Sequence, residues 1–124
     1  MELIGTETRA VLAAHHPEAA GEIANVEQAL ADAPLDPELL RLCQQYFAAA
    51  LNGKAFARPA PGTRDAACIA FCEQFMVSVA NVSDEQVNGL LSHCSGDEVY
   101  NLASAIYLIE MSKRLELTLA RVLS

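Results

Sequence analysis

Basic residues and long apolar runs are both scarce in this sequence. Lysine and arginine number 8 against 16 aspartate and glutamate residues, the net charge is -8, and Arg9 is the only lysine or arginine among the first 40 residues. Because a phosphate backbone requires concentrated positive charge, we expect no nucleic-acid partner. No apolar run approaches the roughly 20 residues that span a bilayer, and the first five residues lack the basic start of a secretory signal. We therefore expect no membrane partner and a cytoplasmic location.

Strand-like alternation is nearly absent, as are internal repeats and low-complexity tracts. The chain has 124 residues, of which 52% are hydrophobic and 19% charged, so it is globular in composition and long enough for one core. We expect a single domain over residues 1–124. Its class is predicted to be all-α, a compact bundle of about six helices.

Helix start signals recur along the chain, and they are of three kinds: a capping side chain, a proline in the first turn, and an acidic residue near the helix N-terminus. Two are capping boxes, Ser83 to Gln86 and Ser95 to Glu98. Asn52-Gly53 is a helix stop signal, because both residues tolerate the left-handed conformation. The predicted helices are 6–16 with Thr6 as the cap, 17–32, 37–51, a helix capped by Thr63, a short helix after Ser83, and 97–122.

Several short motifs, in their order and spacing, resemble the carboxymuconolactone decarboxylase / alkylhydroperoxidase D-like family. They are His-His-Pro-Glu-Ala-Ala at 15–20, Leu-Asp-Pro-Glu-Leu-Leu at 35–40, Pro-Gly-Thr-Arg-Asp at 61–65, Cys-Ser-Gly-Asp-Glu-Val at 94–99 and Lys-Arg-Leu at 113–115. The resemblance covers most of the chain. It implies an alkylhydroperoxidase D-like helical fold and assembly into a homo-oligomer.

The redox motif of that family is missing. In redox-active members a Leu-Asn-Gly-like turn is followed by Cys-x-x-Cys and then a histidine, whereas here Lys54, Ala57 and Pro61 stand at the corresponding positions. Residues 39–51 also contain no acidic side chain to serve as the family's proton relay. A low-pKa thiolate and a resolving thiol are both required for this chemistry. The resemblance therefore implies a degenerate site without Cys-x-x-Cys peroxidase activity.

Four cysteines lie within apolar helical patterns, and Cys68 and Cys72 form a CxxxC pair that could act as a displaced redox couple. On an intact helix their Cβ atoms are about 5–6 Å apart, whereas a disulfide requires about 3.5–4.5 Å, so core thiols are the simpler interpretation. Cys43, Cys94 and His93 supply the remaining residue types of a zinc site but without a recognised spacing. We expect no metal and no cofactor.

The proline-rich loop after Asn52-Gly53 carries Lys54, Phe56 and Arg58. Two cations beside an aromatic ring could hold a small carboxylate or a lactone, and the resemblance implies a ligand pocket near this turn. A solvated connector is the alternative, because loops of this composition usually only join helices.

Two functional hypotheses follow. The first is a divergent family member that binds a small molecule or associates with protein, without Cys-x-x-Cys peroxidase activity. The second is an enzyme, either a thiol-dependent hydroperoxide reductase with an antioxidant role that uses Cys68 and Cys72, or a cysteine-independent lactone decarboxylase-like protein.

Overall fold

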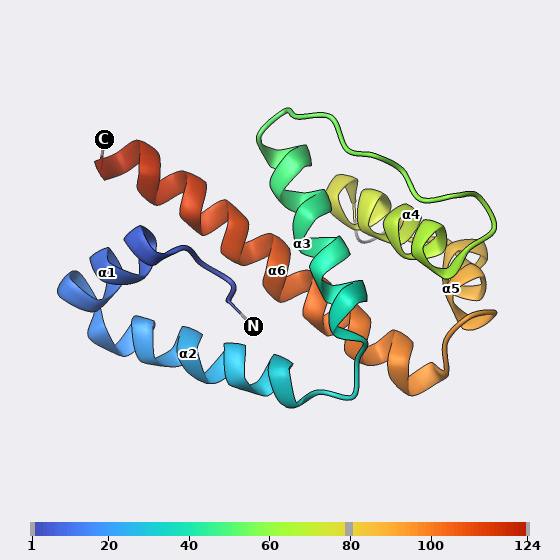
Figure 1. Cartoon of the computed structure of the whole chain (residues 1–124), viewed down its shortest axis with the longest axis horizontal. Coiled ribbons are helices and arrows are strands. Elements are labelled where there is room, and N and C mark those ends of the chain that lie inside the picture. The colour runs from blue at the N-terminus through green and yellow to red at the C-terminus, as the bar shows by residue number, and fades with distance from the viewer. Residues whose placement is uncertain (1, 79–80, 124) are drawn as a thin grey trace. The chain divides into compact units, whose positions relative to one another are not determined.

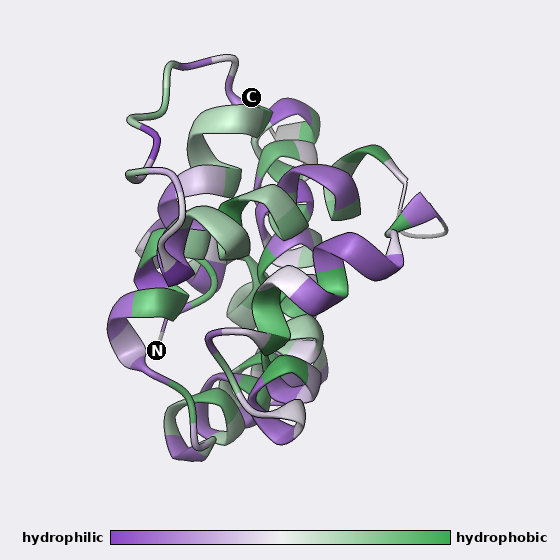
Figure 2. Cartoon of the chain, turned by 90° about the vertical axis from the view of Figure 1, so that its right-hand side faces the viewer, coloured by the Kyte–Doolittle hydropathy of each residue, from purple (hydrophilic) through white to green (hydrophobic). Residues whose placement is uncertain are grey.

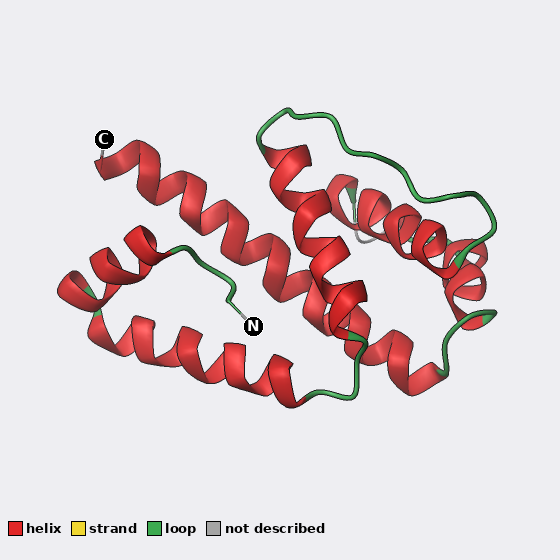
Figure 3. Cartoon of the chain, in the orientation of Figure 1, coloured by secondary structure: helices red, strands yellow, loops and turns green. Residues whose placement is uncertain are grey.

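A computed structural model of the chain describes residues 2–78 and 81–123. Within these residues every regular element is a helix, so the all-α prediction is confirmed (Figures 1 and 3). The six helices are α1 (Thr6–His15), α2 (Pro17–Asp32), α3 (Pro37–Leu51), α4 (Arg64–Val77), α5 (Asp84–Leu91) and α6 (Gly96–Leu123).

The helix boundaries follow the local start signals. The side chain of Asp36 accepts a hydrogen bond from the backbone N–H of Glu38, and that of Thr63 accepts one from Ala66. Ser83 and Gln86 form both bonds of a capping box, so the predicted start of α5 is confirmed. At the start of α6 the same pair of bonds joins Ser95 and Glu98.

Some details of the helical pattern were predicted wrongly. Gly5, not Thr6, is the N-cap of α1; it offers no side-chain oxygen, and its carbonyl accepts from the Arg9 N–H at 3.0 Å. Helical spacing predicts inward faces that include Ala24 and Ala31 on the second helix and Ala120 on the last, but all three are exposed. Alanine contributes little apolar surface to hold such a position against the core. The same spacing predicts Val79 on the buried stripe of α4, and this residue lies outside the described residues.

The turn after α3 behaves as its sequence predicts. Gly53 has φ +65°, in the left-handed region where a residue with a side chain is strained. The N–H of Lys54 donates a hydrogen bond to the carbonyl of Ala49 at 2.8 Å, which closes the end of α3. Residues 54–60 then contain no helix and connect α3 to α4 as a long loop (green in Figure 1). The prolines in this loop lack the backbone donor that a helix needs.

The chain divides into two compact units, here called unit 1 (Met1–Ala33 with Met111–Ser124) and unit 2 (Pro34–Glu110). Unit 1 contains α1, α2 and the C-terminal part of α6. Unit 2 contains α3, α4, α5 and the first part of α6.

Carboxylates tie the N-terminal segment of unit 1 to its helices. Glu27 on α2 accepts a hydrogen bond from the backbone N–H of Leu3 at 2.6 Å and pairs with Arg9 at 2.6 Å. Glu116 on α6 accepts from the N–H of Gly5 at 2.7 Å and also pairs with Lys113. The bonds to the N–H groups of Leu3 and Gly5 thus use polar groups to position a segment that has no helix of its own.

Unit 2 has an apolar interior rich in thiols. Figure 2 shows hydrophobic and hydrophilic residues alternating along individual helices, as in amphipathic helices that bury one face. No helix in the described part of the chain is both long enough and apolar enough to cross a membrane. The buried hydrophobic residues of this unit are Leu39, Leu40, Cys43, Tyr46, Phe47, Cys68, Ile69, Phe71, Cys72, Leu90, Cys94, Leu102, Ala105, Ile106 and Ile109.

Candidate functional site

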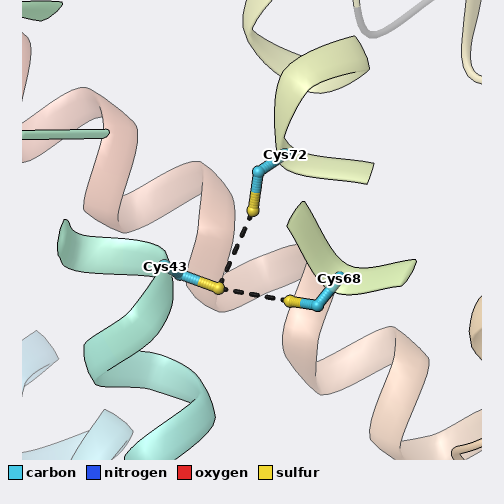
Figure 4. A group of neighbouring side chains, drawn as sticks. All are labelled: Cys43, Cys68 and Cys72. Carbon is cyan, nitrogen blue, oxygen red and sulfur yellow. Dashed lines mark hydrogen bonds between the residues drawn. The ribbon is translucent and has the colours of Figure 1, made fainter. Parts of the chain in front are cut away.

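Three cysteines from two helices meet inside unit 2. The Sγ atom of Cys43 on α3 lies 3.4 Å from that of Cys68 and 3.7 Å from that of Cys72, both on α4 (Figure 4). All three sulfur atoms lie within 4.8 Å of one another, and all three residues are fully buried. We call Cys43, Cys68 and Cys72 the three-cysteine cluster.

Helix periodicity accounts for part of this arrangement. Cys68 and Cys72 are four residues apart, so they lie one above the other on the face of α4 that is turned inward. Cys43 follows Leu40 by three residues and precedes Phe47 by four, which places it on the buried stripe of α3. Packing of α3 against α4 then brings the Cys43 sulfur within reach of both other sulfurs, so that the three form a triangle, as Figure 4 shows.

Hydrogen bonding within the cluster makes the three thiols unequal. Interaction with the Cys68 thiol, and then with the Cys72 thiol, lowers the pKa of Cys43 to about 5, against the opposing effect of burial. The same interactions with Cys43 raise the pKa of Cys68 and of Cys72, and burial raises both further. Cys43 is therefore the sulfur that carries negative charge most readily. The Cys72 thiol donates to it, and in the bond between Cys43 and Cys68 either sulfur can be the donor.

A thiolate beside two thiols can form a disulfide after oxidation, or can hold a soft metal ion. Sequence reasoning singled out Cys68 and Cys72 as a pair but did not join them to Cys43 in a redox role. The available signal was the position of Cys43 on the buried stripe of α3. Its meeting with α4 across 25 residues depends on helix packing, which spacing in the sequence does not reveal.

Cys94 lies apart from the three-cysteine cluster. It is buried, and burial raises the pKa of its thiol. Neither Cys94 nor its exposed neighbour His93 belongs to the group of described residues whose ligand atoms converge, so the zinc combination considered from the sequence is not assembled in that form.

The loop residues predicted to hold a ligand lie in different surroundings. Lys54 is exposed, and Phe56 packs edge-on against Tyr46 with ring centroids 5.4 Å apart. Arg58 pairs with Glu73 on α4, and hydrogen bonding to that carboxylate raises the pKa of the guanidinium. The guanidinium already has a carboxylate partner, so a carboxylate ligand would have to compete with Glu73 for it.

Unit 1 contains an open hollow where α1 meets α2. Its volume is about 500 Å³, and its lining includes the exposed side chains of His15, His16, Glu18 and Glu22. These side chains do not converge as a metal-binding group in the described part of the chain. The three-cysteine cluster is thus the better candidate site.

Comparison of this chain with protein-family models, curated proteins and solved structures gives no match.

Proposed function

We propose that this chain is a divergent relative of the carboxymuconolactone decarboxylase / alkylhydroperoxidase D-like family that has no Cys-x-x-Cys centre and carries its reactive thiols elsewhere. The all-α architecture is compatible with that kinship, and the helix starts occur where the family-like motifs stand. After Gly53 the chain continues as the loop beginning with Lys54, which holds no thiol. Among the described cysteines, only Cys43, Cys68 and Cys72 have sulfurs that converge, so the three-cysteine cluster is the place where a pair of thiols can react.

Thiol-dependent reduction of a hydroperoxide is the activity that the geometry supports best. The observation that carries it is the placement of the Cys43 sulfur 3.4 Å from Cys68 and 3.7 Å from Cys72. A disulfide has an S–S distance of about 2.0 Å, so the Cys43 and Cys68 sulfurs would have to approach by about 1.4 Å to bond once one of them has been oxidised. Cys43 and Cys68 are on different helices, so the fixed Cβ–Cβ distance between residues i and i+4 of one helix does not prevent their sulfurs from bonding.

The chemistry proceeds in two steps. The Cys43 thiolate attacks the terminal oxygen of the hydroperoxide, so that an S–O bond forms and the O–O bond breaks. The leaving alkoxide takes a proton to become an alcohol, or, from hydrogen peroxide, the leaving hydroxide becomes water. The sulfur of Cys68 or Cys72 then attacks the resulting sulfenic acid, forming an S–S bond while hydroxide leaves and is protonated to water. An external dithiol reduces the disulfide and restores both thiols.

Burial governs how the oxidant arrives. The three side chains are fully buried, so a hydroperoxide reaches the sulfur only when the α3–α4 pair opens locally. Small hydroperoxides such as hydrogen peroxide should accordingly react faster than bulky organic ones.

Peroxide consumption in the presence of a dithiol reductant tests the proposal. We expect the wild type to consume hydrogen peroxide, Cys43→Ser to lose at least nine-tenths of the rate, and Cys94→Ser, a buried cysteine outside the cluster, to keep it. Mass spectrometry of the oxidised wild type should find Cys43 linked to Cys68 or Cys72. An inert wild type, or a Cys43→Ser variant as active as the wild type, would show the proposal to be wrong.

Ligand binding at the loop is the second candidate function. It is favoured by the exposed amine of Lys54 close in sequence to the packed Phe56–Tyr46 aromatic pair. A small carboxylate or lactone should then raise the melting temperature, and Lys54→Ala should abolish that rise. Protein association is tested by light scattering, where a strictly monomeric mass would contradict the expected homo-oligomer.

A further inference from the structure

We propose that the three-cysteine cluster is also a three-coordinate binding site for a soft, thiophilic metal ion, and that Cu(I) is the ion that fits it best. The proposal goes beyond peroxide reduction, because it concerns the reduced protein and requires no oxidant. It rests on the distances between the sulfur atoms, on their burial, and on the number of ligands present.

The spacing of the sulfur atoms suits a single ion at their centre. A metal–thiolate bond is about 2.3 Å, so an ion in the plane of three equivalent sulfurs needs them about 4.0 Å apart. The distances from Cys43 are 3.4 and 3.7 Å, and no pair in the cluster exceeds 4.8 Å. Adjustments of less than about 1 Å, within the reach of side-chain rotation, would admit the ion.

The ligand atoms select a soft ion. All three are sulfur, which favours Cu(I) or Zn(II) over Mg²⁺ and Ca²⁺, since the latter prefer oxygen. No other histidine, cysteine, aspartate or glutamate in the described part of the chain joins the group.

The number of ligands separates the two soft ions. Structural Zn(II) is almost always four-coordinate, and a catalytic Zn(II) completes its shell with water. Here the three side chains have no exposed surface, and neither does Phe47, one helical turn from Cys43 on the same face of α3, so water is a poor fourth ligand. Cu(I) is stabilised by thiolate ligands alone, and three sulfurs complete its coordination shell.

Proton release should accompany binding of the ion, because in the metal-free protein the three sulfurs form a hydrogen-bonded cluster of thiols. Each thiol that binds the metal as a thiolate must release its proton. Metal affinity should therefore rise with pH.

Titration of the reduced protein with Cu(I), without oxygen and against a chromophoric chelator, tests the site. We expect one Cu(I) per chain and an affinity at least tenfold lower in Cys43→Ser, with Cys94→Ser as the matched buried control that binds like the wild type. Zn(II), titrated in the same way, should bind more weakly. Circular dichroism checks that each variant is helical.

X-ray absorption at the copper edge of the loaded wild type gives a second measurement that does not depend on a folded variant. Three sulfur neighbours at about 2.3 Å are expected. Fewer than three sulfurs, tighter binding of Zn(II), or no retention of Cu(I) against the chelator would each overturn the proposal. Because no peroxide enters this experiment, failure here leaves peroxide reduction standing, and failure of peroxide reduction leaves the metal site standing.

Discussion

In unit 1 carboxylates reach backbone N–H groups and an arginine, whereas in unit 2 the interior is made of apolar side chains and thiols. Glu27 is buried and serves two donors, the Leu3 N–H and the Arg9 guanidinium. The interior of unit 2 contains large apolar side chains such as that of Phe47, which has no exposed surface. The comparison teaches that a short segment without a helix combines buried side chains, Leu3 and Ile4, with specific polar contacts to its backbone, while packed helices rely on area removed from water.

Removing a large core side chain from unit 2 should have the largest effect. Phe47→Ala leaves a cavity at a site with 0% exposure, and we expect a loss of about 3–5 kcal/mol in the free energy of unfolding. Urea unfolding followed by circular dichroism measures it. Val77→Ala, at a position with 79% exposure, is the control and should leave the midpoint unchanged. A loss below about 1 kcal/mol in Phe47→Ala would mean that the unit 2 interior is loosely packed.

Removing the buried charge of unit 1 should have an intermediate effect that depends on pH. Hydrogen bonding to Arg9 lowers the pKa of Glu27 in the folded state, so its stabilising contribution is present above the unfolded pKa of about 4.3 and is lost as pH falls through the folded value. We expect Glu27→Gln to cost about 1–3 kcal/mol at pH 7 and less near pH 3.

Urea unfolding at both pH values measures this difference. Glu22→Gln on the exposed face of the same helix is the matched control, and it should resemble the wild type at either pH. A cost for Glu27→Gln that does not shrink in acid would contradict the role assigned to its charge.

Breaking the exposed ion pair of unit 2 should have the smallest effect. Arg58 and Glu73 have side-chain exposures of 65% and 35%, compared with 33% and 10% for Arg9 and Glu27. Solvent and salt screen the exposed pair, so Arg58→Ala should unfold at the same urea concentration as the wild type, within measurement error. A destabilisation as large as that of Glu27→Gln would remove the distinction between the two pairs.

Helix boundaries were largely predictable because the interactions that set them are local. The bonds of Ser83 to Gln86 and of Ser95 to Glu98 span three residues, and Pro17 and Pro37 stand at helix starts. The error at Thr6 has a local cause as well, since Gly5 occupies the cap position without a capping side chain. Buried faces were less predictable where alanine occupied them.

The candidate site was predictable only in part. Helical spacing showed that Cys68 and Cys72 share a face, and the apolar pattern of α3 indicated that Cys43 is buried. Neither observation shows that the Cys43 face of α3 packs against the face of α4 that carries Cys68 and Cys72. The ligand-binding role of Lys54, Phe56 and Arg58 stays a prediction. Arg58 pairs with Glu73 on α4, 15 residues further along the chain.

By itself the sequence determined the helical class, most helix starts and the end of α3, because caps, prolines and glycine act within one turn of the chain. Only the tertiary structure decided which side chains meet across long separations. Cys43 reaches Cys68 over 25 residues, Leu3 reaches Glu27 over 24, and Gly5 reaches Glu116 over 111. These meetings result from the packing of whole helices, which depends on many side chains together and leaves no local pattern at the residues concerned.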